Sequence, residues 1–426
     1  MDSFTIRDAN MHVQCIDQTD EEIKHQQIRM MDTIYTQAHL TIIAPEGDAY
    51  QGLPGVNGLC RYKPTILSLG NVKMRIIKDP ITELTLGNWV WTKRAWTYQE
   101  GCLSRRKIFF TSFGVVFWCG PMYRLEGIQY PSISSDERND YFRLILRRAV
   151  PHVRTTPDVS INYMVEAIAH YSEREMTYEH DALNAFLGVL NAFNITHYWG
   201  VPIVPHIITQ LPGMMLFWVT KKAGNERCDF PTWSWTRWNT GISFSRPASD
   251  LRLPTTSSIK TIEIQLQDMR WCNVLGDCPY RGNLGRIGCG KKLRITGYTV
   301  EFQCDPLDDT RYFFVSSSKA REYPFVINFD DKDDLTRKDL AEATMFELDQ
   351  IRVKDKFSLE DRSVFWMWAR YLVLMKQGEE YRRIGLAQPG FWEPPGCDST
   401  AEGEQQDCLD DPIELKGRRL QTIYLV

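Results

Sequence analysis

The hydrophobic pattern of the chain changes from a strand pattern to a helix pattern at Asp17, and this change constrains the fold more than any other feature. Residues 13–16 have the pattern of a strand buried in a parallel sheet. Thr19 and Glu22 then have the spacing of a capping box at the start of a helix, and residues 41–44 have the pattern of a second strand. The segment therefore predicts a strand, a crossover helix and a second strand of an α/β sheet. The helix residues expected on the buried face are Ile23, Gln27, Met30, Met31, Ile34 and Ala38.

Two polar residues, Asp17 and Gln18, directly follow the first predicted strand. In open α/β sheets, ligands bind in the crevice outside the carboxyl ends of the strands, because helix N-termini and loop side chains converge there. Asp17 is therefore a candidate for binding a ribose hydroxyl group. The alternative is that Asp17 only caps or braces the loop, and this interpretation is favoured when the βαβ unit is considered alone.

Composition indicates an ordinary soluble globular protein of 426 residues with 43% hydrophobic and 24% charged side chains. The formal charge is -4 and no basic stripe stands out, which argues against nucleic acid as a partner. Eleven cysteines without a CxxC pair predict reduced thiols and neither a disulfide framework nor a zinc site. The most apolar stretch, residues 206–219, is too short to span a bilayer, so the expected location is cytoplasmic.

Pattern changes along the chain predict an α/β domain over residues 1–120, a helical segment with a Trp-rich block over 121–245 and a β-rich region over 246–426. The first domain is expected to contain one helix from Asn88 to Glu100, followed by a hairpin of strands 107–111 and 115–119. Residues 245–258 have the composition of a linker, and residues 331–351 are expected to be a charged helical insertion. Residues 285–292 nearly match a phosphate-binding loop, but a strand pattern follows where a helix is required. Trp233, Trp235 and Trp238 are expected to pack in the core from the two faces of a strand, in preference to forming a ligand cage.

Trp96 and Glu100 are the strongest catalytic candidates in the sequence. They are four residues apart, which places an aromatic ring and a carboxylate on one face of a helix. A carboxylate beside an apolar ring can have a raised pKa or can orient a ligand hydroxyl. Spacing alone favours the alternative of a core tryptophan with a solvated glutamate. Arg94 could bind a phosphate, although a structural pair with a carboxylate is the favoured interpretation.

Several blocks of the sequence resemble, in the same order, the fungal heterokaryon-incompatibility (HET) domain. They are Cys15-Ile16-Asp17-Gln18, residues 27–44, Gly52-Leu53-Pro54-Gly55, Arg94 to Glu100, Tyr171 to Arg174, Asp181 to Ala185 and Phe230 to Trp235. HET domains usually carry a further strand upstream of the first block, and only Met1 to His12 precede it here. The resemblance therefore implies a domain that lacks its usual N-terminal segment, with a flavodoxin-like or TIR-like α/β fold.

The resemblance also implies a function and a site. HET domains are regarded as remote relatives of Toll/interleukin-receptor (TIR) domains, many of which cleave NAD+ with the Glu of a Trp-Cys-x-x-Glu motif. Trp96-Thr97-x-x-Glu100 has this register with threonine in place of cysteine. It implies Glu100 as the catalytic residue and Asp17, Arg94 and Trp96 as nucleotide-binding residues. NAD+ is then a substrate, and no cofactor or metal is expected.

At the level of the cell, the resemblance implies nonself recognition that triggers programmed cell death, through protein partners and a homo-oligomer. The alternative classes are a non-enzymatic adaptor that signals by protein association and an inactive, truncated paralogue.

Overall fold

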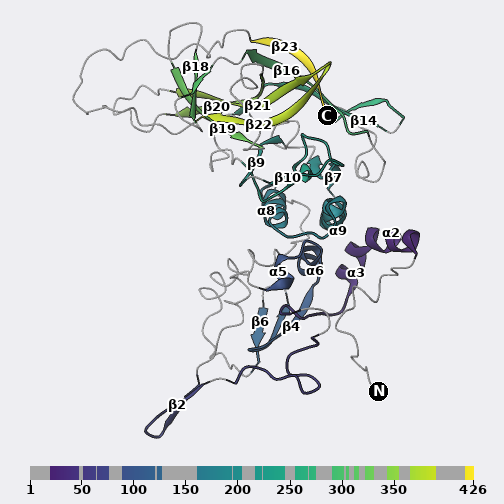
Figure 1. Cartoon of the computed structure of the whole chain (residues 1–426), viewed down its shortest axis with the longest axis vertical. Coiled ribbons are helices and arrows are strands. Elements are labelled where there is room, and N and C mark those ends of the chain that lie inside the picture. The colour runs from purple at the N-terminus through teal and green to yellow at the C-terminus, as the bar shows by residue number, and fades with distance from the viewer. Residues whose placement is uncertain are drawn as a thin grey trace, which may run out of the picture. The chain divides into compact units, whose positions relative to one another are not determined.

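A computed structural model of the chain describes residues 20–47, 51–63, 65–75, 89–119, 122–126, 161–193, 195–203, 216–222, 224–244, 255–266, 268–274, 290–301, 304–306, 311–315, 322–330, 343–354, 365–389 and 418–426. The chain divides into two compact units, residues 1–194 and 195–426 (Figure 1). Asp17 and the first predicted strand lie outside the described residues. The domain boundaries expected at residues 120 and 245 stay predictions.

The first unit combines short helices with a mixed sheet. The helices that the structure describes there are α2 (Glu21–Arg29), α3 (Met31–Gln37), α5 (Val90–Lys93), α6 (Thr97–Leu103), α8 (Ile161–Ser172) and α9 (Asn184–Ala192), with a 3-10 turn η1 at Glu179–Ala182. The described strands are β1 (Thr41–Ile43), β2 (Ile66–Leu69), β3 (Val72–Arg75), β4 (Arg106–Thr111), β5 (Gly114–Cys119) and β6 (Met122–Leu125).

A four-stranded sheet in the order β1-β4-β5-β6 forms the centre of this unit. β1 runs parallel to β4, with Thr41 opposite Lys107, while β4 and β5 form the antiparallel hairpin that the sequence predicts. The mixed α/β character and a parallel strand pair in the N-terminal region are thereby confirmed.

The expected helix after Asp17 differs from the structure in its cap and in its buried face. The Asp20 carboxylate accepts hydrogen bonds from the backbone N–H groups of Glu22 and Ile23, at 2.9 and 3.0 Å, so the cap is one residue later than predicted. The helix breaks at Met30, where φ is −97° and ψ is 5°. Because the 3.6-residue period does not continue across this break, Ile23 and Ile34 of the expected buried face are exposed, as is Met30 itself. The residues of α3 that are buried are Met31 and Tyr35.

The single helix predicted from Asn88 to Glu100 is also interrupted. Arg94 is extended, with φ −75° and ψ 134°, and separates α5 from α6. Its segment pairs in parallel with the chain at Glu175, because Ala95 N donates to Glu175 O at 2.8 Å and Glu175 N donates to Lys93 O at 2.6 Å. This short bridge fixes the start of α6 against the chain that follows α8.

The second unit consists mainly of strands, which confirms the β-rich C-terminal region. Its first described elements are β7 (Thr196–Tyr198), β8 (Val201–Ile203), β9 (Trp218–Thr220), β10 (Asn225–Glu226), the 3-10 turn η3 (Trp235–Arg237), β11 (Trp238–Asn239) and β12 (Ile242–Phe244). The large sheet contains β13 (Thr255–Ser257), β14 (Ile259–Gln265), β15 (Trp271–Asn273), β16 (Leu293–Glu301), β17 (Cys304–Pro306), β18 (Arg311–Val315), β19 (Glu322–Phe329), β20 (Thr344–Lys354), β21 (Phe365–Gln377), β22 (Glu380–Pro389) and β23 (Arg419–Leu425).

Five strands of the large sheet form a closed ring of pairs. β16 pairs with β20, β20 with β21, β21 with β22, β22 with β23 and β23 again with β16. Closing a sheet in this way removes exposed backbone edges. Buried apolar residues that include Met345, Val373 and Ala387 form a core cluster among these strands. Gly378, with φ 64°, makes the turn between β21 and β22.

Two segments that were expected outside the sheet belong to it. Residues 255–257 of the predicted linker form β13 and pair with β20, and residues 344–351 of the predicted charged helix are part of β20 itself. The charged residues suggested an exposed helix, and this prediction was wrong because the acidic side chains of β20 are buried and paired. Asp349 accepts from Arg370 Nε at 3.0 Å, and Glu347 accepts from Arg418 Nη2 at 2.9 Å.

Core packing of the Trp-rich block is confirmed, whereas its expected strand geometry is wrong. Trp233, Trp235 and Trp238 are 1%, 1% and 3% exposed. The 3-10 turn η3 replaces a regular alternation of faces, because the Ser234 side chain accepts a hydrogen bond from Thr236 N and caps the turn. The block lies in the second unit.

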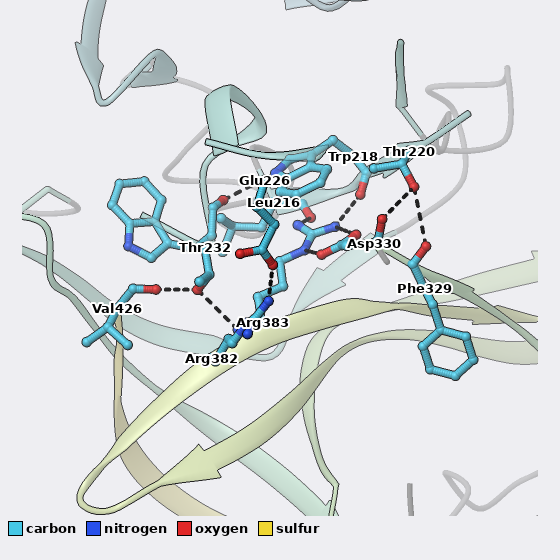
Figure 2. Close-up of polar contacts among 11 residues, drawn as sticks. Leu216, Trp218, Thr220, Glu226, Thr232, Phe329, Asp330, Arg382, Arg383 and Val426 are labelled. Carbon is cyan, nitrogen blue, oxygen red and sulfur yellow. Dashed lines mark hydrogen bonds and ion pairs between the residues drawn. The ribbon is translucent and has the colours of Figure 1, made fainter. Parts of the chain in front are cut away.

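A buried ion pair of the large sheet also binds the backbone at the start of β9 (Figure 2). Arg383 of β22 donates to Asp330 Oδ2 at 2.9 Å and to the carbonyl of Leu216 at 2.8 Å, and its guanidinium also donates to the carbonyl of Trp218. Both side chains of the ion pair are fully buried. Burial raises the pKa of Asp330 and lowers that of Arg383, while their mutual attraction opposes both shifts. The indole ring of Trp218 lies 3.4 Å from the guanidinium carbon and completes the enclosure.

Candidate functional site

Helix α6 is the meeting point of the sequence blocks in the first unit. All seven of its residues, Thr97 to Leu103, are buried. The Tyr98 ring contacts Tyr171 edge-on at 5.7 Å between centroids, and Tyr171 in turn packs on Phe186 at 4.8 Å. The Tyr171 hydroxyl donates to the carbonyl of Ala182 at 2.6 Å. The blocks at 94–100, 171–174 and 181–185 are therefore parts of one core.

Close packing of α9 against α6 leaves no space for a larger residue at one position of α9. A Cβ atom added at Gly188 would lie 2.3 Å from Gln99 Oε1. Gln99 is fully buried and donates to the sulfur of Met31 at 3.1 Å. The amide side chain therefore connects α6 to both α3 and α9.

Glu100 is a buried acid that the structure orients through an indole. Its Oε2 atom accepts a hydrogen bond from Trp91 Nε1 at 3.1 Å, and the residue is 6% exposed. The Trp91 ring itself packs edge-on against Phe109 of β4 at 5.7 Å. The solvated glutamate of the alternative interpretation is therefore wrong, and the ring that donates to Glu100 belongs to Trp91. Trp96 is half-buried and stands at the N-cap of α6.

Arg174 is a largely buried cation that contacts the start of α6. Its Nη1 atom donates to Thr97 Oγ1 at 3.1 Å and to the carbonyl of Arg94 at 3.2 Å, and its guanidinium lies over the Tyr98 ring at 4.8 Å. Burial lowers the pKa of Arg174, and attraction to neighbouring groups, Glu100 among them, raises it. Arginine remains charged under such conditions because the intrinsic pKa of the guanidinium group is far above neutral pH. Arg94 contributes its backbone carbonyl here, while its side chain is exposed.

Lys107 of β4 is a second buried cation near α6. It is 1% exposed, and its ammonium group lies 4.9 Å from the centre of the Trp118 ring. Burial lowers its pKa to about 8. Burial also raises the pKa of Cys102 to about 12, so this thiol stays protonated at neutral pH. Among the described residues, no group of three or more His, Cys, Asp or Glu side chains is placed to hold a metal ion.

Patterns in the sequence do not identify Trp91, Arg174 or Lys107 as part of the site. A usable signal existed for Lys107, because strand alternation places it on the same face of β4 as Phe109 and Thr111. Arg174 belongs to the HET-like block Tyr171 to Arg174, but the sequence gives no indication of its role in the site. Nothing in the sequence could indicate that Trp91 reaches Glu100, since this contact depends on the break between α5 and α6.

Residues 12–100 match the family model described as Heterokaryon incompatibility protein (HET). The chain contains a HET domain. No curated protein matches the chain, and no solved structure does. The match ends at Glu100, so the HET segment includes Trp91 and Glu100, while Lys107 and Arg174 come from the chain that follows it. In the part of the chain that the structure describes, no helix has the length and apolar character needed to cross a membrane.

Because Lys107 is a buried cation, its replacement by an uncharged side chain is expected to stabilise the first unit. Lys107→Met should raise the free energy of unfolding of the first unit at pH 7 by about 1–3 kcal/mol, because methionine is not charged and needs no hydration. The folded-state pKa of about 8 lies below the ordinary value of 10.5, so the unfolded chain binds the proton more tightly. Stability of the wild type should therefore rise between about pH 8 and about pH 10.5, and this rise should be smaller in the variant.

Thermal melting of the full chain at pH 7 and pH 10 measures this effect. Lys93→Met is the matched control, because Lys93 is exposed and its replacement should leave the melting temperature unchanged. A lower melting temperature of Lys107→Met at pH 7 would show that the contact with Trp118 outweighs the cost of burying the charge.

Proposed function

We propose that this protein acts in heterokaryon incompatibility, where its HET domain triggers programmed cell death after nonself recognition. The family match over residues 12–100 supports the proposal. The convergence of two further HET-like blocks, residues 171–174 and 181–185, on α6 extends this support to the residues that follow the match.

The proposed chemistry is cleavage of NAD+ between nicotinamide and ribose, in a TIR-like α/β domain, with Glu100 as the catalytic carboxylate. The observation that carries it is the hydrogen bond from Trp91 Nε1 to Glu100 Oε2 in a buried, aromatic surrounding. A carboxylate that is fixed and partly desolvated stabilises developing positive charge better than one in water, because little reorganisation is needed. The bond-breaking step of a glycosidic cleavage develops such a charge on the ribose.

The other residues have supporting roles in this proposal. Arg174 adds a positive charge that interacts with Glu100 and holds the loop at Arg94 through the carbonyl contact. Asp17 and Trp96 are proposed to bind the nucleotide, with Asp17 on the ribose hydroxyls and Trp96 as a ring beside the substrate. The Arg94 side chain is exposed and is proposed to contact a phosphate.

A non-enzymatic adaptor is the second candidate, and the burial of Glu100 at 6% exposure favours it. Under this reading, Glu100 stabilises the packing of α5 against α6, and the domain signals by association with protein partners or with itself.

Induced expression of the full chain in a fungal strain tests the proposal, with viability and cellular NAD+ measured over time. A fall in NAD+ that precedes cell death supports the enzymatic mechanism. Cell death at constant NAD+ would replace it by the adaptor mechanism. Normal growth in the presence of the incompatible partner would overturn the role in incompatibility itself.

A further inference from the structure

The hairpin of β2 and β3 in the first unit has one fully apolar face. The strands pair in antiparallel register, with Leu67 opposite Met74 and Leu69 opposite Val72. Side chains of directly opposed residues, and of residues two apart, point to the same face of a ribbon. Leu67, Leu69, Val72 and Met74 therefore share one face, while Ser68 and Lys73 lie on the other.

This apolar face is exposed to solvent. Leu67, Leu69, Val72 and Met74 are 44%, 63%, 61% and 43% exposed. The two strands form a sheet of their own and pair with no other strand in the described part of the chain (Figure 1). Gly70, with φ 60°, starts the tight turn that joins them. A two-stranded hairpin is at best marginally stable alone in water, so a surface that covers the apolar face would stabilise it.

The charge of the residues around the hairpin indicates what kind of surface covers the apolar face. Residues 51–78 contain no aspartate or glutamate, although the whole chain has more acidic than basic side chains. The basic residues of this stretch are Arg61, Lys63, Lys73, Arg75 and Lys78. Arg61 is paired with Glu126, whereas Lys63 and Lys73 are exposed. An apolar face next to a basic stretch is the combination that binds anionic lipid, because each Lys or Arg near such a surface adds to the attraction.

A second copy of the chain fits the same surface less well. A stable protein interface buries roughly 800 Å² per partner and involves about 20–30 residues on each side. The apolar face of the hairpin consists of four side chains. Repulsion between the basic stretches of two copies would also oppose their approach.

We propose that the β2–β3 hairpin attaches the protein to the surface of an anionic membrane, with Leu67, Leu69, Val72 and Met74 inserted into the headgroup region. Lys63 and Lys73 do not insert, because Lys73 lies on the opposite face of the ribbon; their charges attract the anionic headgroups over a distance within the Debye length. The attachment is peripheral and involves no spanning segment. It does not depend on NAD+ cleavage, and Glu100→Gln should leave it unchanged.

Flotation of the purified full chain with vesicles tests this inference. Binding is expected to vesicles of phosphatidylcholine with about 20% phosphatidylserine, and much less to phosphatidylcholine alone. Raising the salt from about 0.1 M to about 0.5 M should weaken it, because the electrostatic attraction is screened. The double variant Leu69→Ser/Val72→Ser should reduce the bound fraction on the order of tenfold, since two apolar side chains no longer leave water.

The matched control places the same loss of apolar surface in the other unit. Met269 and Leu420 are 66% and 57% exposed, and Met269→Ser/Leu420→Ser should bind vesicles like the wild type. Unchanged melting temperatures exclude a folding defect in either double variant. The inference is overturned if Leu69→Ser/Val72→Ser still floats, or if binding is equal on neutral vesicles. It is also overturned if the wild type sediments as a dimer that this variant dissociates, which would make the hairpin a contact between copies.

Discussion

Replacing Arg383 by methionine should lower the free energy of unfolding of the second unit by about 3–5 kcal/mol. The substitution keeps a long side chain beside Trp218 but leaves the carboxylate of Asp330 buried without its cation. The carbonyl groups of Leu216 and Trp218 lose the donors that Arg383 provides. An uncompensated buried charge is among the most costly single changes in a protein core.

The neighbouring residue offers a matched control for this prediction. Arg382 forms an ion pair with Glu226, but its side chain is 32% exposed. Arg382→Met should therefore cost at most about 1 kcal/mol, because partly exposed pairs are screened by solvent. Hydrogen exchange of the full chain, followed in peptides that cover β9 and β22, measures both effects in the second unit. Equal loss of protection in the two variants would show that burial of the Arg383–Asp330 pair does not decide the stability.

Glu100→Gln should lower NAD+ turnover by on the order of a hundredfold or more, which is the size of effect expected for a single electrostatic catalytic group. Glutamine preserves the volume of the side chain and can still accept the hydrogen bond from Trp91, but it lacks the negative charge. A glutamate on an open rim would tolerate this change without loss of stability. Because Glu100 is buried and interacts with Arg174, the free energy of unfolding should also fall by about 1–2 kcal/mol in this variant.

Trp91→Phe separates the catalytic from the structural effect of Glu100. It removes the indole donor and keeps the carboxylate and its charge. The melting temperature should fall by a similar amount in both variants, whereas NAD+ turnover should fall much further in Glu100→Gln than in Trp91→Phe, which loses the fixed orientation of the carboxylate but keeps its charge. Similar turnover in the two variants would show that Glu100 acts through packing. Undiminished cell death and an unchanged NAD+ level in Glu100→Gln would favour the adaptor mechanism.

Local patterns were sufficient where neighbours in the sequence are also neighbours in space. The hairpin of β4 and β5 follows from alternation and from turn residues that act over a few positions. The same reasoning failed for α2 and α3 and for the helix before Glu100. At Arg94 the backbone pairs with Glu175, about eighty positions away, and a local pattern contains no record of such a partner.

The sequence by itself determined that the chain has a mixed α/β N-terminal region and a β-rich C-terminal region, and that residues 12–100 match a HET domain. These conclusions rest on periodicity and on ordered motifs, which are properties of the chain alone. Only the tertiary structure decided which ionisable groups are buried. Residue type alone does not distinguish a buried charge from a surface charge. The buried environment is set by segments far away in the sequence for Glu100, Lys107, Asp330 and Arg383. Because the cost of burying a charge depends on the partners that surround it, their roles follow from the fold and not from the pattern.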